Sequence, residues 1–231
     1  MSNIVYCAVN SDLISDTELN YISSFLPDDR LKKAEGYSKD IDRKNCIAAY
    51  FILFYGLNKE YSMGWIPNIS YNAYKKPFFV KEKHINFNLS HCDNSVCCGF
   101  SDSKIGVDIQ SKVHEADSIV DLSMSPNEKD KIMGSEEPGL LFARYWSIKE
   151  AYMKCLGCGL NDKLSELDFS LFQNNHFIYD NLIFNTKYSR NVWITACSAI
   201  DIRKIVIADI RDYIYSQDCT SLIQGRSLIF P

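Results

Sequence analysis

The stretch WSIKEAYMKCLGCGL, residues 146–160, has the spacing of a helix that stops at two glycines. Its apolar side chains recur every three or four residues and form one helical face, made of Ile148, Ala151, Tyr152 and Cys155. The opposite face collects Trp146, Lys149, Glu150, Met153 and Lys154. Because glycine favours the backbone conformation that ends a helix, this helix is expected to end near Gly157. Glu150 and Lys154 have the spacing of an ordinary surface ion pair, which does not account for the tryptophan beside them.

The strand-like run IGVDIQ, residues 105–110, precedes this helix and alternates between two kinds of residue. Ile105, Val107 and Ile109 are expected on one face, and Gly106, Asp108 and Gln110 on the other. Asp108 and Gln110 would then lie roughly 7 Å apart along the strand. A glycine beside an acid lets a bulky ligand approach the backbone. A half-buried strand with a solvated acid would give the same pattern.

Two shorter stretches contain polar groups of interest. The segment FNLSH, residues 87–91, closes a predicted strand with Ser90 and His91. Adjacent residues on a strand point to opposite faces, and the chain has no GxSxG motif, so a serine hydrolase is excluded. Hydroxyl and imidazole donors at a strand end suit phosphate oxygens instead. The segment SPNE, residues 125–128, is a capping box, which by itself explains Glu128.

The remaining periodicity predicts helices and strands in a repeated order. Helices are expected at residues 15–26, from there to about 36, and at 40–58, 114–122, 126–133 and 138–156. Strands are expected at residues 4–9, 78–80, 85–89, 96–101, 105–110, 167–172, 176–179, 182–187, 191–199 and 204–209. Each half has helices followed by a strand meander. We therefore predict the α+β class with two similar, tightly packed subdomains, residues 1–104 and 105–231.

Composition and charge restrict the function further. Of the 231 residues, 46% are hydrophobic and 23% are charged, as in an ordinary globular protein. The net charge of −4 argues against a nucleic-acid coat or a polybasic membrane binder. Basic residues are nevertheless concentrated at residues 30–44 and 75–83, whereas acids predominate after residue 104. The basic clusters are either solvated surfaces or a site for a small polyanion.

The nine cysteines do not indicate a disulfide framework, because their number is odd and the chain is long. No signal peptide is expected, and the longest apolar-rich run, residues 47–57, is too short to span a bilayer. A reduced, cytoplasmic setting is therefore predicted. The CxxC at residues 155–158 lacks the second pair that a zinc site needs. A P-loop motif is missing, and the GxG at residues 157–159 follows a helix where a dinucleotide site needs a strand.

Taken in order, three of these stretches resemble the motifs of the surfactin-type 4′-phosphopantetheinyl transferases. The family has Phe-Asn-x-Ser-His, then Gly-[Ile/Val]-Asp-[Ile/Val]-Glu, then Trp-[Ser/Thr]-x-Lys-Glu-[Ala/Ser]-x-x-Lys-x-x-Gly-x-Gly-Leu; the matching segments are 87–91, 106–110 and 146–160. The resemblance implies Mg²⁺-dependent transfer of the phosphopantetheine arm of coenzyme A to a serine of an apo acyl or peptidyl carrier protein, with release of 3′,5′-ADP. It also implies two similar α+β halves in a pseudo-twofold arrangement, with the active site between them.

The resemblance also assigns roles to residues of this sequence. The metal ligands would be Asp108, Gln110 and Glu150. The catalytic residues would be Glu128, Lys149, Glu150 and Lys154, with either glutamate as the general base. Coenzyme A would be bound by Lys32, Arg43, Lys76, Pro77, Ser90, His91, Asp108, Lys149 and Lys154. The first half would hold the coenzyme phosphates, and the second half would hold the metal and catalytic groups.

Three positions depart from the family pattern. Many relatives have a second acid where Gln110 stands, so a metal site with one charge fewer and weaker Mg²⁺ binding is expected. Some relatives have a lysine at the position of Asp29, where Arg30 would have to substitute. The run of Lys75, Lys76 and Pro77 matches the family's Gly-Lys-Pro only in part.

Other functions stay open from the residues alone. A coenzyme A or carrier-protein binding module that has lost catalysis would keep most of these residues, and Gln110 would then be a sign of decay. A metal-binding or redox protein would depend on the cysteines, and an unrelated α+β domain would share the motifs by coincidence. The enzyme is favoured because its acids and lysines occur together. A monomer without nucleic-acid or membrane partners is expected.

Overall fold

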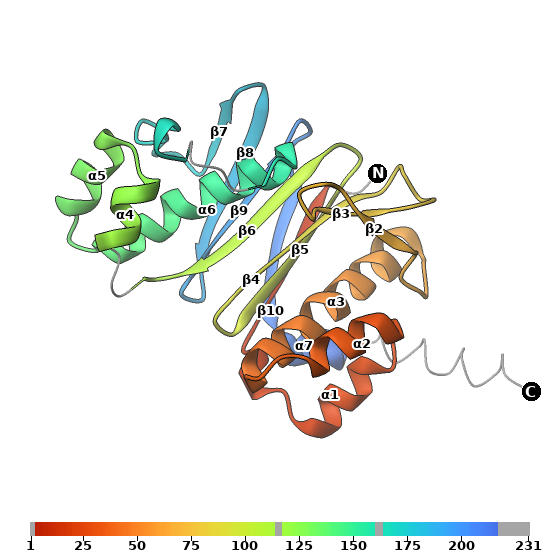
Figure 1. Cartoon of the computed structure of the whole chain (residues 1–231). Coiled ribbons are helices and arrows are strands. Elements are labelled where there is room, and N and C mark those ends of the chain that lie inside the picture. Colours follow the sequence, from red (N-terminus) through yellow and green to blue (C-terminus); the bar gives the residue numbers. More distant parts are fainter. Residues whose placement is uncertain (1–2, 114–116, 160–163, 217–231) are drawn as a thin grey trace, which may run out of the picture.

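The computed structural model describes residues 3–113, 117–159 and 164–216 (Figure 1). The first elements are β1 (Ile4–Val9), η1 (Ser11–Leu13), α1 (Asp16–Ser23), α2 (Asp28–Glu35), α3 (Asp40–Tyr61), β2 (Ile69–Tyr71), β3 (Pro77–Phe79), β4 (Asn86–Cys92) and β5 (Ser95–Ser101). They are followed by β6 (Ile105–Ser111), α4 (Asp117–Ser123), α5 (Pro126–Met133), α6 (Pro138–Leu156), η2 (Leu164–Glu166), β7 (His176–Tyr179), β8 (Leu182–Ser189), β9 (Val192–Ser198), β10 (Lys204–Asp209) and α7 (Ile210–Ile214). The mixture of helices and sheets confirms the predicted α+β class.

The first sheet has the strand order β10-β1-β5-β4. β1 pairs antiparallel with β5 and parallel with β10. One face of this sheet packs on α3, where the apolar-rich run 47–57 is almost entirely buried. Tyr6 and Ala8 of β1 and Phe100 of β5 belong to the same hydrophobic cluster. The run that is too short to cross a bilayer is therefore the helix that fills the first core.

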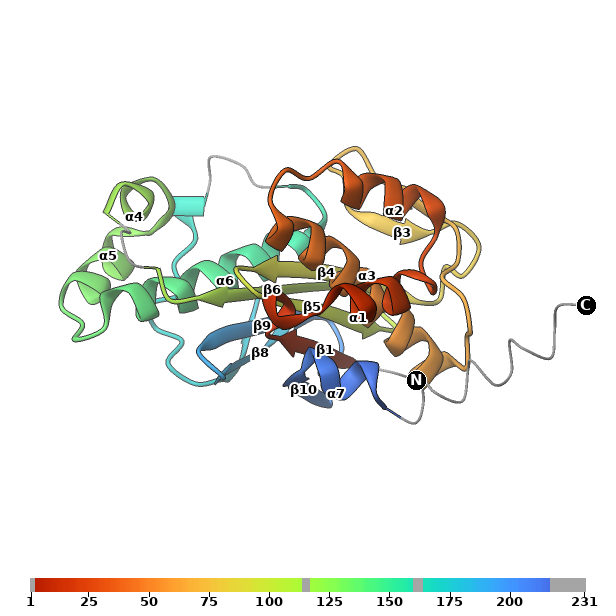
Figure 2. The same cartoon turned by 90° about the horizontal axis from the view of Figure 1, so that it is seen from below.

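The second sheet has the strand order β6-β9-β8-β7 and is antiparallel throughout. Its core is formed with α6, from which Ile148 and Ala151 join Phe184 of β8 and Cys197 of β9. α4 and α5 gather beside α6, at the end of the molecule far from α1, α2 and α3, as both views show (Figures 1 and 2). α6 is therefore covered by the second sheet on one side and by α4 and α5 on another.

A third hydrophobic cluster joins the two sheets. Val5 and Cys7 of β1 contribute to it from the first sheet. From the second sheet come the residues that sequence alternation places on one face of β6, namely Ile105, Val107 and Ile109. Each sheet thus packs a long helix on one face and shares a core with the other sheet on its second face. The alternation also directs Gly106, Asp108 and Gln110 away from this shared core.

The structure differs from the sequence prediction in the C-terminal part. The strand predicted at residues 167–172 is absent, because the backbone amide of Phe169 donates to Glu128 Oε1 and that of Phe172 donates to the carbonyl of Phe169 in a turn. The strand predicted at 204–209 exists as β10 but belongs to the first sheet. The unpredicted helix α7 follows it and places Tyr213 and Ile214 in the first core. The division at residue 104 stays a prediction. β10 and α7 follow this residue in the chain, but they pack with the first sheet and its core.

Some further elements lie outside the predictions or are adjusted by the structure. The turn-rich region after α3 contains the short hairpin of β2 and β3. The helix expected at 114–122 is α4, whose first turn follows residues 114–116, which lie outside the described part. Within the described residues, none of the helices combines the length and the hydropathy that a membrane-spanning segment requires.

Candidate functional site

The close approach of β6 to α6 depends on a glycine. A Cβ atom on Gly106 would overlap with the backbone of α6, at the carbonyl oxygen of Ala151 and the amide nitrogen of Cys155. A strand can approach a helix this closely only where a side chain is missing. The contact brings Asp108, two residues further along β6, beside the last turns of α6. The glycine of the predicted motif thus admits a helix, where the sequence suggested a ligand.

Asp108 lies at the centre of a polar cluster and is only 1% exposed. Lys154 of α6 donates from Nζ to Asp108 Oδ1 over 2.6 Å and to Ser90 Oγ over 3.0 Å. The hydroxyl of Ser90, from β4, donates to the same Asp108 oxygen over 2.7 Å. Gln110 Nε2 donates to the other oxygen, Asp108 Oδ2, over 3.1 Å. The second acid, Glu150, lies one helical turn before Lys154, with its Oε2 3.5 Å from the same Nζ.

One ammonium therefore lies between two carboxylates. Burial opposes the positive charge of Lys154, but Asp108 and Glu150 outweigh it and hold the pKa of Lys154 above its usual value. Burial raises the pKa of Glu150 above its usual value, Asp108 adds to this shift, and Lys154 counteracts it. The cluster is therefore a site where a further cation or a phosphate would change the balance of charge.

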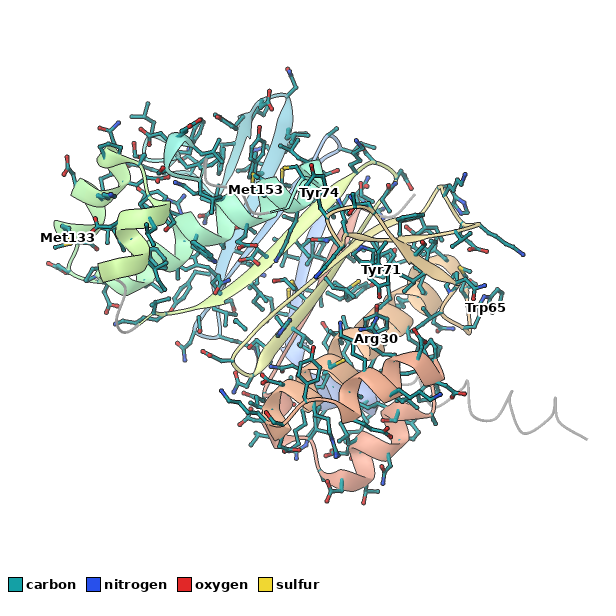
Figure 3. The ribbon with its side chains drawn as sticks, viewed as in Figure 1. Arg30, Trp65, Tyr71, Tyr74, Met133 and Met153 are labelled. Carbon is teal, nitrogen blue, oxygen red and sulfur yellow. The ribbon has the colours of Figure 1, made fainter. Side chains whose placement is uncertain are left out.

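A cavity of about 270 Å³ opens beside this cluster. It is lined by Tyr74, Lys75, Lys76, Pro77, Asn88, Leu89, Glu150, Met153, Lys154, Gly157 and Gly159. Tyr74 and Met153, which come from the loop after β2 and from α6, are labelled side by side in Figure 3. The cavity thus combines two groups of the polar cluster, Glu150 and Lys154, with apolar and aromatic walls, as is common in small-molecule sites.

The loop that forms one wall of this cavity is attached to the end of α6. Lys76 Nζ donates to the carbonyl oxygens of Lys154 at 2.6 Å, Ile105 at 2.9 Å and Cys155 at 3.2 Å. An ammonium has three donors, so these bonds use all of them. Asn72 Nδ2 donates to the carbonyl of Gly157 over 3.0 Å. Lys76 lies at the predicted coenzyme site, but here it ties the loop to the helix C-terminus.

Glu128 and Lys149 form a separate ion pair that is 0% exposed on both sides. Lys149 Nζ lies 2.6 Å from Glu128 Oε2 and donates to the carbonyl oxygens of Ser123 and Leu164, each over 2.8 Å. Burial lowers the pKa of Lys149, and Glu128 counteracts this shift. The helical wheel placed Lys149 on a polar face, but α4, α5 and η2 cover that face. The arrangement gives no support to a phosphate contact by Lys149 or to Glu128 as a general base.

The other predicted coenzyme contacts are spread over the first half. Lys32 is exposed on α2, and Arg43 lines a different cavity, between α1, α2 and α3. His91 is exposed next to Ser90 and lines an open cavity of about 710 Å³ that also contains three acids, Asp12, Asp42 and Asp93. Pro77 lines the cavity beside Lys154. The structure therefore brings Ser90, Asp108, Gln110, Glu150 and Lys154 together, but not Lys32 or Arg43.

Arg30, which would have to substitute for the lysine that some relatives have at position 29, is bound inside the first half. Its side chain is buried, stacks over the ring of Tyr50 at 3.7 Å, and donates to the hydroxyls of Tyr50 and Tyr71. Figure 3 shows Arg30 and Tyr71 approaching each other from α2 and from the hairpin.

The spacing of Glu150 and Lys154 does not account for Trp146, which lies on the same helical face. Trp146 stacks on Phe142 within α6, with 5.8 Å between the ring centroids.

The cysteines that the structure describes are all free thiols. Cys155 is buried and contacts the carbonyl of Lys104, and Cys158 is half-buried near the carbonyl of Met153. Within residues 3–113, 117–159 and 164–216, no three His, Cys, Asp or Glu side chains converge as metal ligands. The hard oxygen donors of Asp108, Glu150 and Gln110 still fit Mg²⁺, which binds through one or two carboxylates together with phosphates and water.

Sequence reasoning missed two contributors to the site. Asn88 Oδ1 accepts a bond from the backbone amide of Val107 over 2.9 Å, which joins β4 to β6 next to Asp108. Asn88 is the second residue of the FNLSH segment, so the motif itself pointed to it as a candidate site residue. Asn72 follows the unpredicted strand β2, and no local pattern connects it with α6.

Comparison with known proteins links this site to a family. Residues 104–213 match the family model described as the 4′-phosphopantetheinyl transferase superfamily. The chain is 30% identical over 142 residues to an L-aminoadipate-semialdehyde dehydrogenase-phosphopantetheinyl transferase of Candida glabrata, covering 57% of this chain and 54% of that protein. It is 32% identical over 113 residues to the 4′-phosphopantetheinyl transferase gsp of Aneurinibacillus migulanus, covering 47% and 46%.

A third relative is matched over a longer range. The 4′-phosphopantetheinyl transferase Sfp of Bacillus subtilis is 23% identical over 164 residues, which covers 70% of this chain and 73% of that protein. The match spans about half the length of the Candida and Aneurinibacillus transferases. The family-model match includes Asp108, Glu150 and Lys154, whereas Ser90 lies before it.

Proposed function

We propose that the chain, whose residues 104–213 match the model of the 4′-phosphopantetheinyl transferase superfamily, transfers 4′-phosphopantetheine from coenzyme A to a serine of an apo carrier protein. The other product is 3′,5′-ADP. The observation that carries the proposal is the cluster of Ser90, Asp108, Glu150 and Lys154 beside a cavity, within the family-matched region and its neighbouring strand.

The reaction requires a new bond between the serine Oγ of the carrier and the phosphorus that bears pantetheine. The bond from that phosphorus to the bridging oxygen breaks, and the serine proton goes to a base. Glu150 is our choice for the base, acting through a water molecule, because it lines the cavity and Glu128 does not. Lys154 can stabilise negative charge on the departing phosphate, because its pKa is raised and it stays charged.

Asp108 and Ser90 hold Lys154 in place. Asp108 Oδ1 accepts bonds from both Lys154 and Ser90, so the ammonium has a fixed position before a phosphate arrives. Such preorganised charge is the main source of catalysis in phosphoryl transfer. His91 and Pro77 remain proposed coenzyme contacts, since His91 follows Ser90 in the chain and Pro77 lines the cavity beside Lys154. Lys32 and Arg43 remain predictions without support from the arrangement.

Mg²⁺ would be held by Asp108, Glu150 and, through its amide oxygen, Gln110. Its chemical contribution when bound is to neutralise negative charge on the pyrophosphate. Asp108 and Glu150 suit a metal ion because both carboxylates already contact one cation, the ammonium of Lys154. We also propose a cytoplasmic, monomeric enzyme whose partners are coenzyme A and a carrier protein.

The test is intact-mass measurement of a panel of apo carrier proteins after incubation with the protein, coenzyme A and Mg²⁺. A gain of one phosphopantetheine on any carrier supports the enzyme. Formation of a stable complex with coenzyme A or a carrier, without any mass gain across the panel, would favour the binding module that has lost catalysis.

A further inference from the structure

The pair formed by Glu128 and Lys149 has a different environment from the polar cluster around Asp108. Neither residue lines the cavity beside Lys154. Both side chains are 0% exposed, so the pair lies fully inside the protein. Their partners come from the end of α4, the start of α5, the centre of α6, η2 and the segment that follows η2. The contacts of the pair therefore connect these elements of the second half with one another.

The hydrogen-bonding capacity of the pair is used within the protein. Lys149 has three donors, and it contacts Glu128 Oε2 and the carbonyls of Ser123 and Leu164. Glu128 Oε2 also accepts from the backbone amide of Ser125 over 2.8 Å, as part of the capping box of α5. Glu128 Oε1 accepts from the backbone amide of Phe169 over 2.9 Å. No donor of Lys149 is left for a phosphate.

Lys149 is the neighbour of Glu150 in the chain. Successive residues of an α-helix point about 100° apart, so one helix turn can serve two surroundings. Lys149 enters the interior formed by α4, α5 and η2, whereas Glu150 lines the cavity and contacts Lys154. The rotation and height of α6 at Glu150 are therefore tied to the buried pair one residue earlier.

We propose that Glu128 and Lys149 are positioning residues, which fix α6 against α4, α5 and the segment after η2 so that Glu150 and Lys154 face the cavity. The proposal rests on the proposed function, because it concerns the same reaction. It replaces the direct roles that the family resemblance gives to the two residues. A general base must come within hydrogen-bond reach of the proton that it removes, which a fully buried and paired Glu128 does not.

The experiment is a double-mutant cycle with Glu128→Gln, Lys149→Met and the double variant. Each single substitution leaves a buried charge without its partner, so Tm is expected to fall on the order of 10 °C. In the folded single variants kcat should fall roughly 10- to 100-fold, because a small misplacement of Glu150 and Lys154 is enough. The KM for coenzyme A should change little.

The double variant removes both charges together. Its Tm and kcat should exceed those of at least one single variant, and kcat should return to within roughly tenfold of the wild type. The acid limb of the pH profile of kcat should survive in Glu128→Gln, because the base is a different residue. A merely structural role would not predict the partial recovery of kcat at temperatures where all variants are folded.

The exposed pair of Lys129 and Asp121 provides a matched control. It also connects α5 with α4, at 3.3 Å, but its side chains are 31% and 78% exposed. Lys129→Met and Asp121→Asn should change Tm and kcat very little, because surface ion pairs contribute little to stability. A large effect of these substitutions would mean that any change between α4 and α5 is harmful.

Three results would overturn the proposal. These are a double variant less stable than both single variants, a folded double variant whose kcat loss is the product of the two single losses, and loss of the acid limb in Glu128→Gln. Failure of the proposed function is a different outcome, in which the wild-type protein modifies no carrier. The coupling between the two substitutions in Tm would then still decide whether the pair anchors α6.

Discussion

Asp108 and Glu150 share the ammonium of Lys154, and this arrangement explains how two acids are kept close together inside the protein. Each acid alone would be costly to bury as a charge, and the lysine offsets part of that cost. Ser90 and Gln110 then saturate the remaining sides of Asp108. At the scale of single residues, the site combines two carboxylates with one ammonium. Binding of a substrate phosphate or of a cation would change the net charge of this group.

The pH dependence of activity tests this balance. In Lys154→Met, Glu150 loses the group that lowers its pKa, while burial and Asp108 continue to raise it. Because Glu150 must be ionised to accept a proton, the acid limb of kcat/KM should move to higher pH, and the rate should fall roughly 10²- to 10³-fold. The measurement is the pH profile of residual transfer. The control is Lys112→Met, which disrupts an exposed pair with Glu137 and should leave the pH profile unchanged. If the acid limb does not move in Lys154→Met, Glu150 is not the base.

Gln110 tests the proposed cation site. Its amide donates to Asp108 Oδ2 over 3.1 Å, so Gln110→Glu would place a second carboxylate at that distance. Repulsion between the two acids should be relieved by a cation, and the Mg²⁺ concentration for half-maximal rate should fall. Asn185→Asp is the matched control, because Asn185 makes a similar bond to Asp201 away from the site. An unchanged Mg²⁺ requirement in Gln110→Glu would mean that position 110 is not near the metal.

At the scale of elements, the site depends on β6 and α6 lying in direct contact. Gly106 permits this contact, and the αL conformation of Gly157, with φ of 73°, ends α6 where Lys76 and Asn72 bind its carbonyls. β4 approaches β6 from the other side through Asn88. The three elements converge on Asp108, although they are far apart in the chain.

Gly106→Ala should separate β6 from α6. The added Cβ would overlap with helix backbone, which has no flexible end that can move away. We expect a loss of unfolding free energy on the order of 3 kcal/mol and a lower transfer rate. Denaturant unfolding measures the first quantity. Gly134→Ala is the control, since Gly134 has a negative φ of −84° at the end of α5, and equal effects of the two substitutions would argue against the contact.

Local pattern predicted much of this element structure and part of the site. The alternation in β6 correctly assigned Asp108 to the face away from the shared core, and the glycine at the end of α6 was correctly interpreted. The helical wheel could not place Lys149, because α4, α5 and η2 cover a face that looks polar in isolation. Phe169 lies in a segment whose alternation is typical of a strand, but its side chain is buried in the second core and its backbone amide donates to Glu128.

At the scale of the whole molecule, the two halves are joined by more than a shared site. β10 forms the edge of the first sheet by pairing in parallel with β1, and Tyr213 of α7 donates to the carbonyl of Cys7 over 3.0 Å. The pairing of β10 with the first sheet could not be predicted from local pattern, because the partner of a strand depends on long-range packing. The chain therefore crosses twice between the two four-stranded sheets, from β5 to β6 and from β9 to β10.

This exchange predicts that the first half is not an independent folding unit. A fragment of residues 1–104 lacks β10 and α7, so the edge of β1 and part of its core would be open to water. It should show no cooperative unfolding transition when followed by circular dichroism. Addition of the separate fragment 105–231 should restore a transition if the two associate. A cooperative transition of the first fragment alone would contradict this view of the fold.

We propose that the cluster of Ser90, Asp108, Glu150 and Lys154 performs the transfer. The most direct measurement quantifies holo-carrier by intact mass and 3′,5′-ADP by chromatography in the same reaction, for the wild type and for Asp108→Asn. We predict equal amounts of both products from the wild type and a roughly 10²- to 10³-fold lower rate for Asp108→Asn. Transfer at the wild-type rate by Asp108→Asn, or carrier binding without release of 3′,5′-ADP, would contradict the account.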